Sequence, residues 1–137
     1  MKFFVTLCIL LMPLCSYAQQ QSPLDDPQQQ KKFYESIEKT VDNYITLLDL
    51  KSWQAFKIDS TLTHDYMEMM KELEELNKAR VSNMDFFQRV QDTWNEKIYN
   101  SMRSILSDAQ WEKYLKNGAM REKKARDKRE KKRNKTK

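Results

Sequence analysis

The stretch LSDAQW, residues 106–111, decides the fold of this chain. A serine three residues before a glutamine can form a capping box, in which the Ser107 hydroxyl accepts from the backbone N–H of Gln110 and the Gln110 side chain accepts from the N–H of Ser107. Leu106 and Trp111 occupy the two positions of a hydrophobic staple, which fixes the angle at which the preceding chain enters the helix. The stretch therefore predicts a corner between two helices.

A weaker copy of the same pattern, LKSWQ, begins at Leu50. Leu50 and Gln54 keep the spacing of the first pattern, but Lys51 stands where a hydroxyl cap belongs. Asp49 and Ser52 are alternative caps, because both have a side-chain oxygen that can accept from a helix N-terminus. The copy predicts a second helical corner whose capping residue stays open.

The positions of glycine and proline, which interrupt helices, also predict helices joined by short corners. Residues 28–117 contain neither glycine nor proline, whereas a sheet protein of this size needs turn residues at regular intervals. Apolar residues recur at steps of three and four, which predicts helices over residues 28–48, 52–80, 82–105 and 107–118. The predicted fold is all-α, an elongated, hairpin-type bundle of four helices over residues 31–118. The predicted core positions are Phe33, Ile37, Val41, Tyr44, Leu48, Ile58, Leu62, Tyr66, Met69, Leu73, Leu76, Phe87, Val90, Trp94, Ile98, Met102, Ile105, Tyr114 and Leu115.

Residues 1–18 have the pattern of a secretory signal peptide. A lysine precedes an apolar run, and small residues precede a predicted cleavage between Ala18 and Gln19. The apolar run is broken at Pro13, short of the length of a membrane anchor, and the residues before Cys15 are a poor lipid-attachment signal. Both cysteines, Cys8 and Cys15, would leave with this segment, so thiol chemistry and disulfides are not expected in the exported chain.

The two ends of the exported chain differ from its body. Residues 19–30 are rich in glutamine and contain two prolines, which predicts a flexible linker. Residues 119–137 carry eleven lysines and arginines against three acidic residues, whereas the body between them is acidic. This basic tail has almost no apolar residues, so we expect it to be helical near its start and partly disordered toward its end.

Two copies of Leu-Thr/Ser-x-x-Gln in a small exported helical chain resemble the LTxxQ-motif family of the bacterial periplasm, the Spy/CpxP-like proteins. The resemblance spans residues 33–117 and is complete at Leu106, Ser107 and Gln110, but it holds only at Leu50 and Gln54 in the first copy. It implies a four-helix, cradle-shaped homodimer that binds unfolded proteins without ATP, and some relatives sense or bind metals. A homodimer is also expected from packing, because a thin helical arrangement leaves apolar stripes uncovered.

Enzymatic chemistry is not expected. The exported chain has one histidine, no cysteine and no glycine-rich phosphate loop, and paired carboxylates such as Glu74 and Glu75 are typical of a solvated helix face. His64, Met67 and Glu68 share one helical face and could suit copper. A single histidine is a poor cage, so no metal and no cofactor are predicted.

Met67, Met70, Met84 and Phe86 are the candidate client-binding residues, because flexible thioethers and an aromatic ring can adapt to many sequences. Their alternative role is ordinary core and dimer packing. The basic tail lacks interleaved aromatics, so nucleic acid is not an expected partner, whereas weak contact with acidic membrane surfaces, polysaccharides or clients is compatible with its charge. A merely solvated tail is an equal alternative.

Together these patterns predict a periplasmic, ATP-independent, chaperone-like protein that binds unfolded or stressed envelope proteins. A metal-sensing or stress-sensing regulatory module and a scaffold for one dedicated partner are the alternatives. The residues of the two motifs would hold the corners and perform no chemistry.

Overall fold

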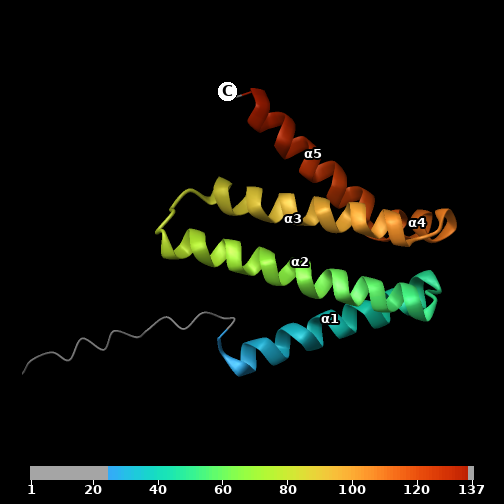
Figure 1. Ribbon diagram of the computed structural model, residues 1–137. Helices are drawn as coiled ribbons and strands as arrows, with labels where there is room; N and C mark the ends of the chain where they lie inside the picture. Colours follow the sequence, from blue (N-terminus) through green and yellow to red (C-terminus); the bar gives the residue numbers. More distant parts are fainter. Residues whose placement is uncertain (1–24, 136–137) are drawn as a thin grey trace, which may run out of the picture.

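The structure, a computed structural model, describes residues 25–135, and within them the all-helical prediction is confirmed (Figure 1). No strand occurs in this part of the chain. The predicted signal peptide and its cleavage between Ala18 and Gln19 lie outside these residues. The elements are α1 (Pro27–Leu48), α2 (Ser52–Lys78), α3 (Met84–Ile105), α4 (Asp108–Tyr114), a kinked turn (Leu115–Ala119) and α5 (Met120–Lys135).

The helices form an open, elongated arrangement rather than a closed bundle (Figure 1). The two long helices α2 and α3 run antiparallel as a hairpin, and α1 folds back along α2. The corner between α1 and α2 and the corner between α3 and α4 lie at the same end of the hairpin, and α5 then runs back at an angle that opens away from α3 toward its C-terminal end. No helix within residues 25–135 is long and apolar enough to cross a membrane.

The first helix begins earlier than the predicted linker allows. Pro27 stands at the first helical position, where its missing N–H costs nothing, and the Asp26 side chain accepts from the N–H of Gln28 at 2.9 Å. Residues 27–30 are therefore helical, in agreement with the helix predicted from residue 28 and not with a linker that extends through residue 30.

The hydrophobic core lies toward the end of the hairpin that carries the two corners. Leu48, Ile58 and Met102 are fully buried there, one from each of the three long helices. Toward the other end the predicted core positions Met69, Leu73 and Leu76 are only partly covered. The buried apolar residues of this core are Ile37, Val41, Leu48, Ile58, Leu62, Ile98, Met102, Ile105 and Leu106.

The fourth helix ends near the residue that the sequence indicates. Gly118 has a φ of 110°, a conformation that residues with a Cβ rarely adopt, and the chain changes direction there. Instead of stopping, the chain continues as α5.

Candidate functional site

The corner at Ser107 contains the capping box that its sequence predicts. The Ser107 hydroxyl accepts from the N–H of Gln110 at 3.3 Å, and Gln110 Oε1 accepts from the N–H of Ser107 at 2.9 Å. Leu106 is buried in the core, and the Trp111 ring packs between Tyr99 and Tyr114. The corner is therefore closed by polar groups at its start and by aromatic packing beyond it.

The corner at Leu50 has only half of this arrangement. Lys51 is the N-cap of α2, and Gln54 Oε1 accepts from its N–H at 3.0 Å. The second bond of a capping box, in which the side chain of residue 51 would accept from the N–H of Gln54, cannot form, because a lysine ammonium only donates. The alternatives are wrong, since Asp49 has a left-handed φ of 53° and ends α1, whereas Ser52 is already the first residue of α2.

The two corners are joined by the glutamine pair, Gln54 and Gln110. Gln54 Nε2 donates to Gln110 Oε1 at 2.8 Å and to the carbonyl of Ile105 at 3.0 Å. Gln110 Nε2 donates to Gln54 Oε1 at 3.1 Å and to the carbonyl of Asp49 at 3.2 Å. Gln54 thus caps the start of α2 and binds the end of α3. Gln110 caps the start of α4 and binds the residue that ends α1.

An apolar groove lies between the first part of α1 and the middle of α2. It has a volume of about 300 Å³ and is lined by Phe33 and Tyr34 from α1 and by Met67 and Met70 from α2, together with the polar side chains of Gln29, Gln30 and Lys71. The two aromatic rings meet edge to face with centroids 5.4 Å apart, and Tyr34 is 48% exposed. Two of the predicted client-binding residues therefore share one site.

The other two candidates lie elsewhere. Met84 and Phe86 are in the first turn of α3 and do not line the apolar groove. Both are exposed, Met84 by 74%, and Arg89 lies 5.9 Å from the centre of the Phe86 ring. The structure thus separates the four predicted residues into two sites.

A further exposed apolar surface was not assigned from the sequence. Trp53 and Phe56 near the start of α2 are 53% and 72% exposed, and Lys57 lies over the Trp53 ring at 5.9 Å. Trp53 stands inside the motif copy and Phe56 falls off the buried stripe at Ile58 and Leu62, so their positions on the helix were a usable signal.

The residues considered for metal are engaged with other partners. His64 Nδ1 lies 2.8 Å from Asp65, and the buried Asp65 carboxylate also pairs with Lys97 at 3.0 Å. Glu68 pairs with Lys71, and a hydrogen bond from that ammonium lowers the pKa of the carboxyl below its usual range. Within residues 25–135 no group of three or more His, Cys, Asp or Glu side chains could hold a metal ion.

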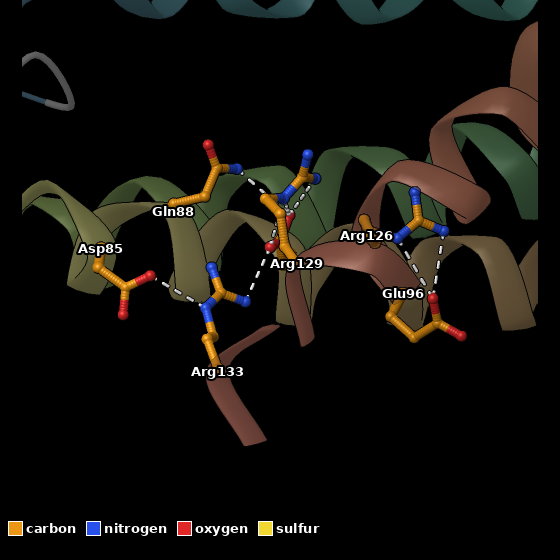
Figure 2. A network of polar contacts seen from close by, with 7 residues as sticks. Asp85, Gln88, Glu96, Arg126, Arg129 and Arg133 are labelled. Carbon is orange, nitrogen blue, oxygen red and sulfur yellow. Dashed lines mark hydrogen bonds and ion pairs between the residues drawn. The ribbon is translucent and has the colours of Figure 1, made fainter. Parts of the chain in front are cut away.

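The basic tail is held against α3 by a group of ion pairs that we call the arginine clasp (Figure 2). Arg126 pairs with Glu96 at 3.2 Å, and Arg129 pairs with Asp92 at 2.6 Å. Arg133 bridges Asp92 and Asp85, both at 3.0 Å. The six residues of the clasp are Arg126, Arg129, Arg133, Asp85, Asp92 and Glu96.

The arginine clasp lies along the tail, which is helical through Lys135 as α5. Arginines at 126, 129 and 133 lie on one face of this helix, where each can pair with carboxylates of α3. A signal was present in the sequence, because Asp85 and Asp92 are seven residues apart and share a face of α3. The net charge of the tail does not indicate that its arginines have these acidic partners on α3.

Asp92 is the centre of the clasp. Burial alone would raise the pKa of its carboxyl, but hydrogen bonds from Arg129, Arg133 and Gln88 outweigh burial and hold the pKa below its ordinary value. Hydrogen bonds from Arg133 and Arg89 likewise lower the pKa of Asp85. Both carboxylates are therefore charged at neutral pH.

A polar cleft of about 500 Å³ lies between the helices where α5 leaves the body. Tyr44, Tyr66, Tyr99 and Tyr114 line it, and Arg126 lies 5.5 Å from the centre of the Tyr99 ring. Burial raises the pKa of Tyr114, Tyr44 and Tyr66 above the ordinary value. The cleft is a structural junction in which α5 is anchored by its most buried arginine.

Comparisons with protein-family models, with curated proteins and with solved structures found no match.

Proposed function

We propose that this protein is exported to the periplasm and binds unfolded or stressed envelope proteins without nucleotide. The observation that carries the proposal is the apolar groove, in which two thioethers and two aromatic rings are accessible beside a cation. Methionine side chains adapt their shape to different partners, and aromatic rings supply large contact areas. This chemistry fits short apolar segments of many sequences.

The other exposed apolar residues support weak, distributed binding. Trp53 and Phe56 lie at one end of α2, and Met84 and Phe86 lie at the start of α3. Several small contacts separated by charged surface hold an unfolded chain without enclosing it, and the charges keep the complex dissolved. The resemblance of the two corner motifs to the LTxxQ-motif family points to the same activity.

We also propose that two copies associate, because the long hairpin is incompletely covered far from its corners. Met69, Leu73 and Leu76 retain partial exposure there, and Trp94 on α3 is likewise only partly covered. Pairing of two such faces would remove apolar area from water. Light scattering of purified residues 19–137 tests this association, and a monomer at all concentrations would contradict it.

The test of function is suppression of aggregation of a chemically unfolded model protein by residues 19–137 without nucleotide. We expect suppression at near-stoichiometric amounts, and we expect Met67→Gln combined with Met70→Gln to weaken it severalfold. The matched control is Leu47→Gln combined with Met120→Gln, which changes two exposed apolar residues outside the apolar groove and outside the other proposed contacts.

Each result has a distinct meaning. Absence of suppression by the parent protein would overturn general client binding and favour one dedicated partner. Equal losses in the groove variant and in the control would place binding outside the apolar groove. Loss of suppression at moderate salt would assign the attraction to surface charge.

A further inference from the structure

The charges of α5 are sorted by face. At 100° per residue, the residues of the arginine clasp on α5 and all three of its acidic residues lie within about 100° of Arg126. These acidic residues are Glu122, Asp127 and Glu130. The half of α5 that faces α3 is therefore electrically mixed and largely neutralised.

The opposite face of α5 carries only positive charge. Lys124, Lys128, Lys131 and Lys135 follow one another at steps of four, three and four, and all four are exposed. Within residues 25–135 none of these four has an ion-pair partner. We call them the outer lysine face, which spans about 17 Å at 1.5 Å per residue.

The residue types on the two faces differ in what they recognise. Arginine makes bidentate, directional pairs, and the arginines at 126, 129 and 133 are occupied by carboxylates of α3 (Figure 2). Lysine is a compact, hydrated charge that is attracted to a dense anionic surface without defined geometry. The outer lysine face has no aromatic ring for stacking on bases and no apolar residue for insertion.

A straight row of lysines on a rigid helix matches a flat layer of negative charge. Because the arginine clasp holds the other face of α5, the row is fixed on the outside of the molecule and can approach a plane along its whole length. We infer that α5 binds the surface of an anionic lipid bilayer through the outer lysine face. Binding is peripheral and electrostatic, and it does not depend on the client binding proposed above.

The test is co-sedimentation of residues 19–137 with lipid vesicles. We expect binding to vesicles of phosphatidylcholine with about 30% phosphatidylglycerol, no binding to phosphatidylcholine alone, and release in about 0.5 M salt. Each lysine near such a surface raises the partition coefficient roughly fivefold. Changing Lys124, Lys128, Lys131 and Lys135 to Gln is therefore expected to lower it on the order of several hundredfold.

The matched control changes four exposed lysines of the helical body to Gln, with the same loss of net charge. These are Lys32, Lys39, Lys57 and Lys113. We expect this control to keep most of the binding. Circular dichroism should show that both variants remain helical, because glutamine and lysine have similar helix propensities.

Three results would overturn the inference. The first is equal binding by the four-lysine variant and the parent, and the second is an equal loss in the control, which would mean that only net charge matters. The third is binding to a short DNA duplex under conditions in which the anionic vesicles are not bound. Unchanged aggregation suppression by the four-lysine variant would show that this surface is separate from client binding.

Discussion

The side chains of Gln54 and Gln110 donate to each other, with Nε2 to Oε1 distances of 2.8 and 3.1 Å. Because each carbonyl oxygen also accepts from the N–H of its own capping residue, every polar atom of the two amides is used. Gln54 is only 4% exposed, so water cannot replace these bonds. The two corners therefore support each other.

Loss of either glutamine should destabilise both corners. We expect Gln54→Ala to lower the free energy of unfolding by about 2–4 kcal/mol, because buried partners lose their donor, and Gln110→Ala by about 1–2 kcal/mol. The double variant should lose about 1 kcal/mol less than the sum of the two. Urea unfolding followed by circular dichroism measures all three, with Gln91→Ala on the exposed surface of α3 as control. Additive losses would contradict the mutual support.

A hydroxyl at residue 51 should complete the first capping box. The φ and ψ of Lys51 are −72° and 153°, which suit a serine cap, so Lys51→Ser should stabilise the protein by roughly 0.5–1 kcal/mol. The reverse change at the other corner, Ser107→Ala, should cost about 1 kcal/mol. Thermal unfolding of both variants measures these effects. No gain at residue 51 would show that the glutamine pair alone defines that corner.

Acid should release α5 from α3. The folded-state pKa values of Asp85 and Asp92 lie below the ordinary value, so their contribution is complete above about pH 4 and is lost as the pH falls through the folded-state values. Fluorescent labels on Ser82→Cys and Asn134→Cys should move apart below that pH. Asp92→Asn should cause separation at neutral pH, because the central carboxylate of the arginine clasp is removed.

The matched control for this experiment is Asp59→Asn, which changes an exposed aspartate on α2. It should leave the label distance unchanged at neutral pH. A label distance that is independent of pH in the parent would show that something other than the arginine clasp holds α5.

High pH should destabilise the protein, because it favours ionisation of tyrosines that are buried in the folded state. The folded-state pKa of Tyr114 is raised by burial and by the nearby Tyr44 and Tyr66, so its stabilising contribution is complete below about pH 10 and is lost as the pH rises through the folded-state value. We expect the phenolate absorbance of Tyr114 to appear together with unfolding. Tyr114→Phe should shift alkaline unfolding to higher pH, whereas Tyr34→Phe, at an exposed ring, should leave it unchanged. Phenolate absorbance from Tyr114 without unfolding would contradict the prediction.

The helices and corners were predictable because their signals are local. A cap, a staple and an apolar step of three or four act within a few residues, and Ser107, Leu106 and Gly118 carry such signals. The contact between Gln54 and Gln110 depends on how two corners meet in space, and nothing in either motif alone specifies it. Local signals therefore predict each corner but not the hydrogen bonds that join the two corners.

The tail and the candidate binding residues show the same limit. A helix with almost no apolar residues is expected to fray, but Asp92 and its neighbours on α3 supply partners that local propensity does not include. Met67 and Met70 were predicted as client-binding residues from their side-chain chemistry, but the groove that they line is completed by Phe33 and Tyr34 from α1. Periodicity places a side chain on a face, whereas the crossing of another helix decides what lies opposite.

The glutamine pair also closes the α2–α3 hairpin into a ring. One end of the hairpin is tied by the peptide chain through residues 79–83, and the other is tied by hydrogen bonds between residues near the start of α2 and just beyond the end of α3. If α2 slid along α3 by a single residue, Gln54 would lose its hydrogen bonds to the Ile105 carbonyl and to Gln110. The short connection at residues 79–83 restricts the same movement at the other end. The register of α2 against α3 is thereby fixed from both ends, even where their shared apolar surface is thin.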